Sequence, residues 1–384
     1  MSASSDGASA PWLNYGRQSI VDEDIAAVAE VLRGDWLTTG PLVGAFEAEL
    51  ERVTGAPAVS VTSGTAALHA TYGGLGLGPG DEVVTTPITF VATASGAAQL
   101  GARIRFADVC DDTLNIDPAA VEAQLTSRTA AVAAVDYAGH PIDADALRPL
   151  CDRVGAVLIE DAAHSVGGSY KGRPVGSFAD ITTLSFFPTK NLTTAEGGAI
   201  VSPHADLLTE IRRFARIGMV RDKDQLRSPD EGDWWYEVPA FGLNYRLPDV
   251  LCALGLSQLK RLPMFVARRA QLVARYNELL ADVPGLRLPT QRDDVDPAWH
   301  LYAVRVLDGR RREVFEKMRA AGIGVQVNYI PVYWHPVFAD SGYQRGLCPV
   351  AEQAYSELVS LPLFADLTDA EQDRVVDTLR GILT

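Results

Sequence analysis

The chain has 384 residues, of which 47% are hydrophobic and 22% are charged, and its formal net charge is −15. This length and composition predict a large folded core and exclude disorder as the main state of the chain. The negative charge argues against a nucleic-acid partner, because nucleic-acid phosphates require a basic surface. No apolar run approaches the ~18 residues of a membrane span, so we expect no membrane segment.

The cysteines and histidines show no metal-binding pattern. Cys110, Cys151, Cys252 and Cys348 are too far apart for a metal or redox motif, and we interpret them as free thiols in a reducing cytoplasm. No two of the six histidines have metal-ligand spacing, so no metal site is predicted. The first residues are small and polar, which predicts a disordered tail over 1–12 and no signal peptide.

Two helices are expected near the start of the chain. Ile25, Val28 and Leu32 repeat at helical spacing, and Gly34 ends this first helix. The loop that follows, 35–41, contains an aromatic and two hydroxyl side chains, and a second helix comes after it. From the residues alone, this loop is a plain turn between two helices.

A small polar turn follows the first predicted strand, 58–61. Ser63, Gly64 and Thr65 come directly after this strand and open a helix through Ala70. The N-terminus of a helix offers free amide groups and a positive dipole end, which suit a phosphate. An ordinary helix cap is the alternative, and for these three residues alone it is the better interpretation.

Apolar strands alternate with helices through the middle of the chain. Residues 130–135 form an all-apolar strand, 147–154 a helix, and 156–160 another buried strand. Strands of this kind, separated by helices, predict a mainly parallel sheet that is covered on both faces.

An aspartate and a lysine are the candidate chemical residues. Asp161 stands at the carboxyl end of a buried strand, where open α/β sheets bind ligands, although it could instead cap the next helix. Lys190 follows about thirty residues later between two β-runs. A lysine there is usually a surface charge, but a desolvated lysine forms Schiff bases with carbonyls, and an aspartate can keep a pyridine nitrogen protonated. The pair therefore suggests a pyridoxal phosphate enzyme.

The last third of the chain has a different character. A polar loop over 218–240 contains Trp234, Trp235 and Tyr236, and we expect it to form a subunit contact or a platform for a sugar. The alternative is a loop that folds back on its own core. A long helix is expected from 248 to about 260.

The residues after this helix alternate between helices and short strands. We therefore predict a large domain over 13–255 and a small α+β domain over 256–384. The expected elements of the small domain are a strand over 302–306, a helix over 312–320, a strand over 325–329 and a final helix over 369–383.

Taken together, the motifs resemble those of the sugar aminotransferases of the DegT/DnrJ/EryC1/StrS family. They come in the family's order and cover nearly the whole chain: Thr62–Leu68, Thr86–Ala94, Glu160–His164, Ser185–Lys190, Glu196–Gly198 and Gly242–Arg246. The resemblance implies the α/β type I aminotransferase fold. It has a large domain with a mostly parallel, seven-stranded sheet and a small C-terminal domain.

The resemblance also assigns roles to residues. Lys190 is the implied catalytic residue and binds pyridoxal 5'-phosphate covalently as a Schiff base. The other implied cofactor contacts are Ser63, Gly64, Thr65, Phe90, Asp161, His164, Ser185 and Asn244. The implied substrate contacts are Tyr15, Trp36, Leu37, Thr38, Arg246, Asn328 and Tyr329. Because Asn244 would reach the cofactor of a neighbouring subunit, the resemblance implies a homodimer with shared active sites.

The implied reaction transfers an amino group from L-glutamate to a nucleotide-linked 4-keto-6-deoxy sugar. Within the family, the chain is most similar to the transaminases of pseudaminic acid biosynthesis, which aminate C4 of UDP-2-acetamido-2,6-dideoxy-4-keto-hexose. The segments Thr85–Ala94, Val135–Gly139 and Thr193–Gly198 carry this similarity. Asn328 departs from it, because a histidine is usual there, so a C3 or C4 aminotransferase acting on a dTDP-keto sugar stays open.

Two other classes are alternatives to an aminotransferase. Some relatives of this fold are pyridoxal phosphate-dependent sugar dehydratases, which are lyases and carry a histidine in place of the lysine. Lys190 argues against that class. A non-catalytic relative is the other alternative, and the intact lysine, aspartate and phosphate turn argue against it.

Overall fold

The computed structural model describes residues 11–384, so the predicted tail over 1–12 lies, except for its last two residues, outside the described part. The centre of the structure is a seven-stranded sheet, as predicted. Its strands are parallel except β9, which runs antiparallel to both of its neighbours. In spatial order they are β1 (Ala58–Val61), β9 (Gly198–Val201), β8 (Ile181–Ser185), β5 (Val157–Asp161), β4 (Thr129–Val135), β2 (Glu82–Thr85) and β3 (Arg103–Phe106).

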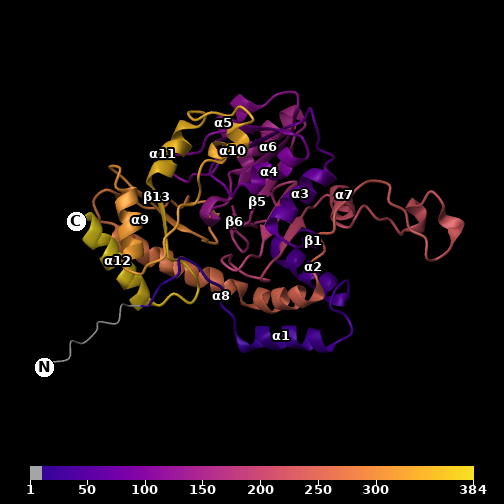
Figure 1. The fold of residues 1–384 in the computed structure, drawn as a ribbon, viewed down its shortest axis with the longest axis horizontal. Helices are drawn as coiled ribbons and strands as arrows, with labels where there is room; N and C mark the ends of the chain where they lie inside the picture. The colour runs from indigo at the N-terminus through magenta and orange to yellow at the C-terminus, as the bar shows by residue number, and fades with distance from the viewer. Residues whose placement is uncertain (1–10) are drawn as a thin grey trace.

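Helices cover both faces of this sheet (Figure 1). Alternate residues of β4 enter different cores: Ala131 and Ala133 belong to one cluster, Val132 and Ala134 to the other. This is why the central strands are apolar at every position, as the sequence predicts for a doubly covered sheet. The helices of the large body are α2 (Pro41–Thr54), α3 (Gly64–Gly74), α4 (Ala92–Gln99), α5 (Pro118–Gln124), α6 (Ala144–Val154) and α7 (Ala205–Ala215).

The long helix α8 (Asp249–Leu280) connects the two parts of the molecule (Figure 1). The predicted end near residue 260 is wrong, because the helix continues through Pro263 for another five turns or so. By length and composition alone, α8 could cross a membrane, because an 18-residue window of it has a mean hydropathy of 1.3. In this structure 44% of that window is buried. The helix packs against α1 (Asp22–Arg33) and α2, so its apolar residues serve the core. The predicted domain boundary at 255/256 falls inside α8 and stays a prediction.

The C-terminal part has its own core around a three-stranded sheet. Tyr276 of α8 stacks on Tyr302 with ring centroids 4.6 Å apart. The predicted strand over 325–329 is wrong, since only Gln326 pairs with a strand, through an isolated bridge to Ser360. The elements of this part are β10 (Leu286–Arg287), β12 (Tyr302–Val306), β13 (Leu358–Leu361), α9 (Arg311–Ala320), α10 (Pro336–Ala339), α11 (Pro349–Glu357) and α12 (Asp369–Leu383).

A small third sheet and a projecting loop complete the fold. The sheet consists of β11 (Val295–Asp296), β6 (Ser169–Tyr170) and β7 (Arg173–Pro174). The loop between α7 and α8 extends away from the body of the molecule (Figure 1), so the alternative of a loop folded on its own core is wrong. Trp234 is 75% exposed and Phe241 is 98% exposed. These apolar side chains have no cover within the described chain.

Candidate active site

Lys190 and Asp161 face the same cavity, which has a volume of about 430 Å³. Asp161 is the last residue of β5, and Lys190 lies in the loop that follows the neighbouring parallel strand β8. The cavity therefore lies at the carboxyl ends of these strands, where open α/β sheets bind ligands. Asp161 and Lys190 are about thirty residues apart in the sequence. The parallel pairing of β5 and β8 brings them to the same edge of the sheet.

Asp161 is held in one orientation by two hydrogen bonds. The Thr93 hydroxyl donates to Oδ2 at 2.7 Å, and the backbone N–H of Ala163 donates to Oδ1 at 3.2 Å. Only 4% of Asp161 is exposed, and this burial raises the pKa of its carboxyl. The two hydrogen bonds and the charge of Lys190 act in the opposite direction. A positively charged partner in the cavity would favour the ionised carboxylate further.

Lys190 has a perturbed amine. Its side chain borders the cavity, and its backbone N–H donates to the carbonyl of Phe187 at 2.9 Å. Desolvation lowers the pKa of Lys190 to about 8, although the Asp161 carboxylate acts in the opposite direction. At this pKa roughly a tenth of the amine is unprotonated at pH 7. The unprotonated amine is the state that attacks a carbonyl.

His164 lies in the same cavity, three residues after Asp161, and is 5% exposed. Its Nε2 lies 3.1 Å from the Tyr329 hydroxyl, whereas its buried Nδ1 has no partner among the described residues. Burial and the charge of Lys190 hold the pKa of His164 well below its usual value. The ring is consequently neutral and keeps one nitrogen free for a further hydrogen bond.

The predicted phosphate turn forms one end of the cavity. Ser63 caps α3 by accepting a hydrogen bond from the backbone N–H of Ala66 at 3.0 Å. A Cβ on Gly64 would lie 2.8 Å from the Cβ of Ser185, and one on Gly198 would lie 2.5 Å from the carbonyl of Ser63. Glycine thus allows β8 and β9 to approach the turn closely. Ser63, Gly64, Thr65 and Ser185 all line the cavity.

Aromatic side chains form another part of the cavity wall. Phe90 is 58% exposed, which is unusual for a phenylalanine, and its ring centroid lies 6.4 Å from that of Tyr329. Tyr15, Tyr329 and Asn328 also line the cavity, as expected for substrate contacts. Burial raises the pKa of Tyr15, so its hydroxyl stays protonated. The Oδ1 atom of Asn328 is buried and has no partner among the described residues.

Five of the predicted site residues do not line this cavity: Trp36, Leu37, Thr38, Asn244 and Arg246. Asn244 and Arg246 flank Tyr245, whose carbonyl accepts a hydrogen bond from the backbone N–H of Thr62 at 2.9 Å. Both residues therefore lie close to the phosphate turn that begins at Ser63. Asn244 is nevertheless exposed to solvent. Its predicted contact with the cofactor of a neighbouring subunit stays a prediction.

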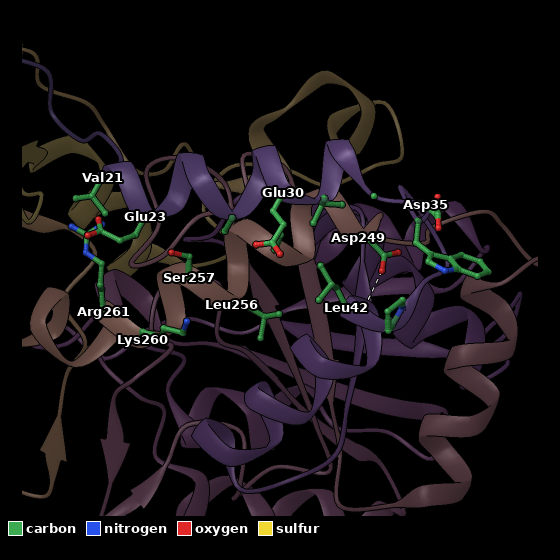
Figure 2. Close-up of a pocket in the computed structure, with 16 residues that line it drawn as sticks. Val21, Glu23, Glu30, Asp35, Leu42, Asp249, Leu256, Ser257, Lys260 and Arg261 are labelled. Carbon is green, nitrogen blue, oxygen red and sulfur yellow. Dashed lines mark hydrogen bonds between the residues drawn. The ribbon is translucent and has the colours of Figure 1, made fainter.

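Trp36 lies instead at a larger hollow of about 790 Å³ between α1, α2 and α8 (Figure 2). The buried acid of this hollow is Asp249, whose carboxylate accepts hydrogen bonds from the backbone N–H groups of Gly40 at 2.8 Å and Leu42 at 3.0 Å. Asp249 thus holds the start of α2, a structural task. The larger hollow does not contain the lysine and aspartate pair, so we assign the chemistry to the smaller cavity.

Thr93 and His300 are among the cavity residues that sequence reasoning did not assign to the site. Thr93 is part of a motif that carried the family resemblance, but its bond to Asp161 could not be read from the sequence. His300 lies in the cavity wall and packs against His164 with its ring tilted by 39°, although nothing in its sequence surroundings marks it. Across residues 11–384, no group of three or more His, Cys, Asp and Glu side chains is placed to hold a metal ion.

The cavity fits pyridoxal phosphate by the chemistry of its residues. The unpartnered Nδ1 of His164 and the exposed face of Phe90 suit an aromatic ring with a hydroxyl, and the amides at the start of α3 suit a phosphate. Lys190 and Asp161 suit the aldehyde and the ring nitrogen. Fold and cavity together define the class of pyridoxal phosphate-dependent enzymes with the type I fold.

The chain belongs to the DegT/DnrJ/EryC1/StrS aminotransferase family, whose model matches residues 18–380. It is 39% identical to the spore coat polysaccharide biosynthesis protein SpsC of Bacillus subtilis, over 97% of both chains. Spr1654 of Streptococcus pneumoniae, solved in a pyridoxamine phosphate form, has a TM-score of 0.91 at 29% identity, covering 96% of this chain and 98% of that one. A pyridoxal phosphate form of the same protein is also known.

A third relative has a named pathway. Helicobacter pylori PseC, an aminotransferase involved in the biosynthesis of pseudoaminic acid, has a TM-score of 0.90 at 29% identity, covering 97% of this chain and 99% of that one. The family and these structures identify the chain as a pyridoxal phosphate-dependent aminotransferase. The predicted fold class and cofactor are thereby confirmed.

The role of Asp161 can be tested by the substitution Asp161→Asn. The amide keeps the size of the side chain but carries no negative charge, so we expect a fall in kcat on the order of 100-fold or more. The protein should keep its fold and part of its cofactor, measured by circular dichroism and by absorbance of the bound cofactor.

Glu122→Gln is a matched control, because it removes one carboxylate whose side chain is 55% exposed and pairs with Arg153 on the surface. This variant should keep the activity of the unaltered protein. Near-normal turnover of Asp161→Asn would contradict the assigned role of the carboxylate.

Proposed function

We propose that this enzyme transfers the amino group of L-glutamate to a nucleotide-linked 4-keto-6-deoxy sugar. The proposed sugar is UDP-2-acetamido-2,6-dideoxy-4-keto-hexose, and the product is UDP-4-amino-4,6-dideoxy-N-acetyl-altrosamine. The observation that carries the reaction type is the shared cavity of Lys190 and Asp161, which the parallel strands β5 and β8 position.

Lys190, Asp161 and His164 have different roles in the proposed reaction. Pyridoxal phosphate, when bound, supplies an aldehyde that exchanges amines and a ring that accepts electrons. The Nζ atom of Lys190, with a pKa of about 8, can take a proton from the donor's α-carbon and return it in the second half of the reaction. Asp161 supplies the fixed negative charge for the ring nitrogen, and His164 stays neutral beside it.

Two observations support a sugar as the acceptor. Relatives of this chain include a spore coat polysaccharide biosynthesis protein and PseC, an aminotransferase involved in the biosynthesis of pseudoaminic acid. The cavity also combines the aromatic rings of Tyr15, Phe90 and Tyr329 with the unpartnered Oδ1 of Asn328. Rings that cover apolar faces, together with a free amide, are suited to a sugar with hydroxyl groups.

The proposed substrate can be tested with a panel of UDP- and dTDP-linked 4-keto sugars and a 3-keto sugar. Each is incubated with L-glutamate that carries nitrogen-15 in its amino group, and the products are analysed by mass spectrometry. We expect the label in the sugar only with the UDP-linked 2-acetamido substrate, and no label with the Lys190→Ala variant.

Other outcomes would identify a different substrate or reaction. Label in a dTDP-linked sugar would replace the proposed acceptor by the alternative one. A dehydrated sugar without label would contradict amino transfer and indicate a lyase.

We further propose that the active enzyme is a homodimer with shared active sites. Among the described residues that line the cavity, Lys190 is the only lysine or arginine. A nucleotide diphosphate and a dicarboxylate donor both require cations. Burial, Arg212 and Arg246 lower the pKa of Arg216, although its ion pair with Glu47 at 3.6 Å acts in the opposite direction. An anion in a partner's site would further stabilise this cluster of arginines.

Exposed apolar side chains also support a second copy. Ile25 and Leu32 of α1 are each 59% exposed, and Trp234 and Phe241 of the projecting loop are more exposed still. Large apolar patches on a monomer mark contact surfaces. The loop carries Asn244 close to its end, so docking of the loop on a second chain would bring this residue toward a neighbouring cavity.

We also place the enzyme in the cytoplasm. All four cysteines are free, and Cys151, Cys252 and Cys348 are buried. A reducing compartment keeps thiols in this state.

Mixed dimers can test the shared site. Lys190→Ala and Asn244→Ala chains are each expected to be inactive, but a hybrid of the two should recover activity. In the hybrid, one site takes both defects and the other takes neither, so up to about half of the normal activity per dimer should return. The measurement is turnover of dimers purified with two different affinity tags.

A hybrid of Lys190→Ala with Asp161→Asn is the matched control. Both of these residues belong to the same chain's cavity, so each site in this hybrid keeps one defect and no activity should return. Full activity of Asn244→Ala alone, or no recovery in the first hybrid, would contradict a shared site.

A further inference from the structure

His300 forms part of the cavity wall behind His164. It is 4% exposed and lies just before β12, where its backbone N–H donates to the carbonyl of Ala138 at 2.8 Å. Its ring centroid is 4.4 Å from that of His164, with an angle of 39° between the planes. The Nδ1 atom of His300 is buried and has no partner among the described residues. The two imidazole rings therefore pack closely in a tilted arrangement, and no hydrogen bond joins them.

Two basic side chains lie close to His300. One is the partly buried Lys190, and the other is the buried Arg269 of α8, which donates to the carbonyls of His300 at 3.3 Å and Leu363 at 3.0 Å. Burial, followed by the charges of Lys190 and Arg269, holds the pKa of His300 well below its usual value. Protonation of His300 would place a further positive charge among these groups, so its imidazole stays neutral.

His164 has two aromatic neighbours. The tilted ring of His300 packs against it, and the ring of Tyr329 lies nearly parallel at 6.1 Å between centroids, with an angle of 18°. The Tyr329 hydroxyl contacts the Nε2 of His164. Loss of the His300 ring would free one side of His164 and open a path for water toward Lys190, since both line the same cavity.

We propose that His300 is a positioning residue of the aminotransferase site, which holds the imidazole of His164 in place and keeps water away from the Lys190 amine. It acts through its neutral, planar ring and does not itself transfer a proton. This proposal rests on the aminotransferase activity, and it does not depend on which sugar is the acceptor.

The test compares His300→Ala and His300→Phe in cofactor-free protein. The Lys190 amine is labelled with acetic anhydride at a series of pH values, and the Lys190 peptide is quantified by mass spectrometry. In the unaltered protein the midpoint should lie near pH 8. We expect it to rise by about one pH unit in His300→Ala, because water reaches the amine, and to stay low in His300→Phe, whose ring keeps the cavity closed.

Activity provides a second measurement in the same variants. The loss of kcat in His300→Ala should be on the order of 100-fold, because His164 loses its position, and His300→Phe should recover most of it. His204→Ala, which removes a histidine at the surface, should leave both measurements unchanged. Melting curves identify any variant that is unfolded.

Two results would overturn the proposal. An unshifted Lys190 midpoint in a folded His300→Ala variant would show that the ring does not shield the amine. A His300→Phe variant as impaired as His300→Ala would show that the ring nitrogens, and not the planar ring, are required. The labelling uses neither donor nor sugar, so its outcome is independent of the proposed substrate.

Discussion

The burial of Lys190 beside Asp161 is the constraint on which the rest of the active site depends. Taking an amine and a carboxylate out of water costs several kcal/mol per ion, so each needs partners that the protein holds in place. Thr93 and the backbone of Ala163 hold the carboxylate, and the parallel strands β5 and β8 set its place relative to the lysine. The same burial lowers the pKa of Lys190 to about 8 and keeps His164 neutral. Removal of these side chains from water thus explains both the partners that hold Asp161 and the lowered pKa of Lys190.

Two features of the single chain support the proposed homodimer. Among the described residues that line the cavity, Lys190 is the only lysine or arginine, and burial and Arg246 lower the pKa of Arg216, which pairs with Glu47. The projecting loop between α7 and α8 exposes Trp234 and Phe241 (Figure 1). Formation of a homodimer would cover these apolar side chains. It would also bring polar groups of one chain to the cavity of the other.

The parts of the structure that depend on local sequence could be predicted, and those that depend on distant contacts could not. The apolar strands and the helices between them are visible in the sequence, and they predict a parallel sheet. Asp161 and Lys190 follow such strands directly in the chain, so the sequence also predicts that they lie at the same edge of the sheet. The contact between the rings of His300 and His164 joins residues far apart in the chain, and the sequence carries no signal of it. Residues 325–329 have the composition of a strand but find no partner beyond one bridge. The helix expected to end near residue 260 continues through Pro263 to Leu280.

The most direct test of the account is to locate the covalent bond between cofactor and protein. Borohydride reduction makes this bond permanent, and peptide mass spectrometry then identifies the modified lysine. The account predicts a purified protein that is yellow before reduction and carries the cofactor's mass on the peptide containing Lys190, with none on this peptide in Lys190→Ala. Modification of any other lysine in the unaltered protein would contradict the central assignment.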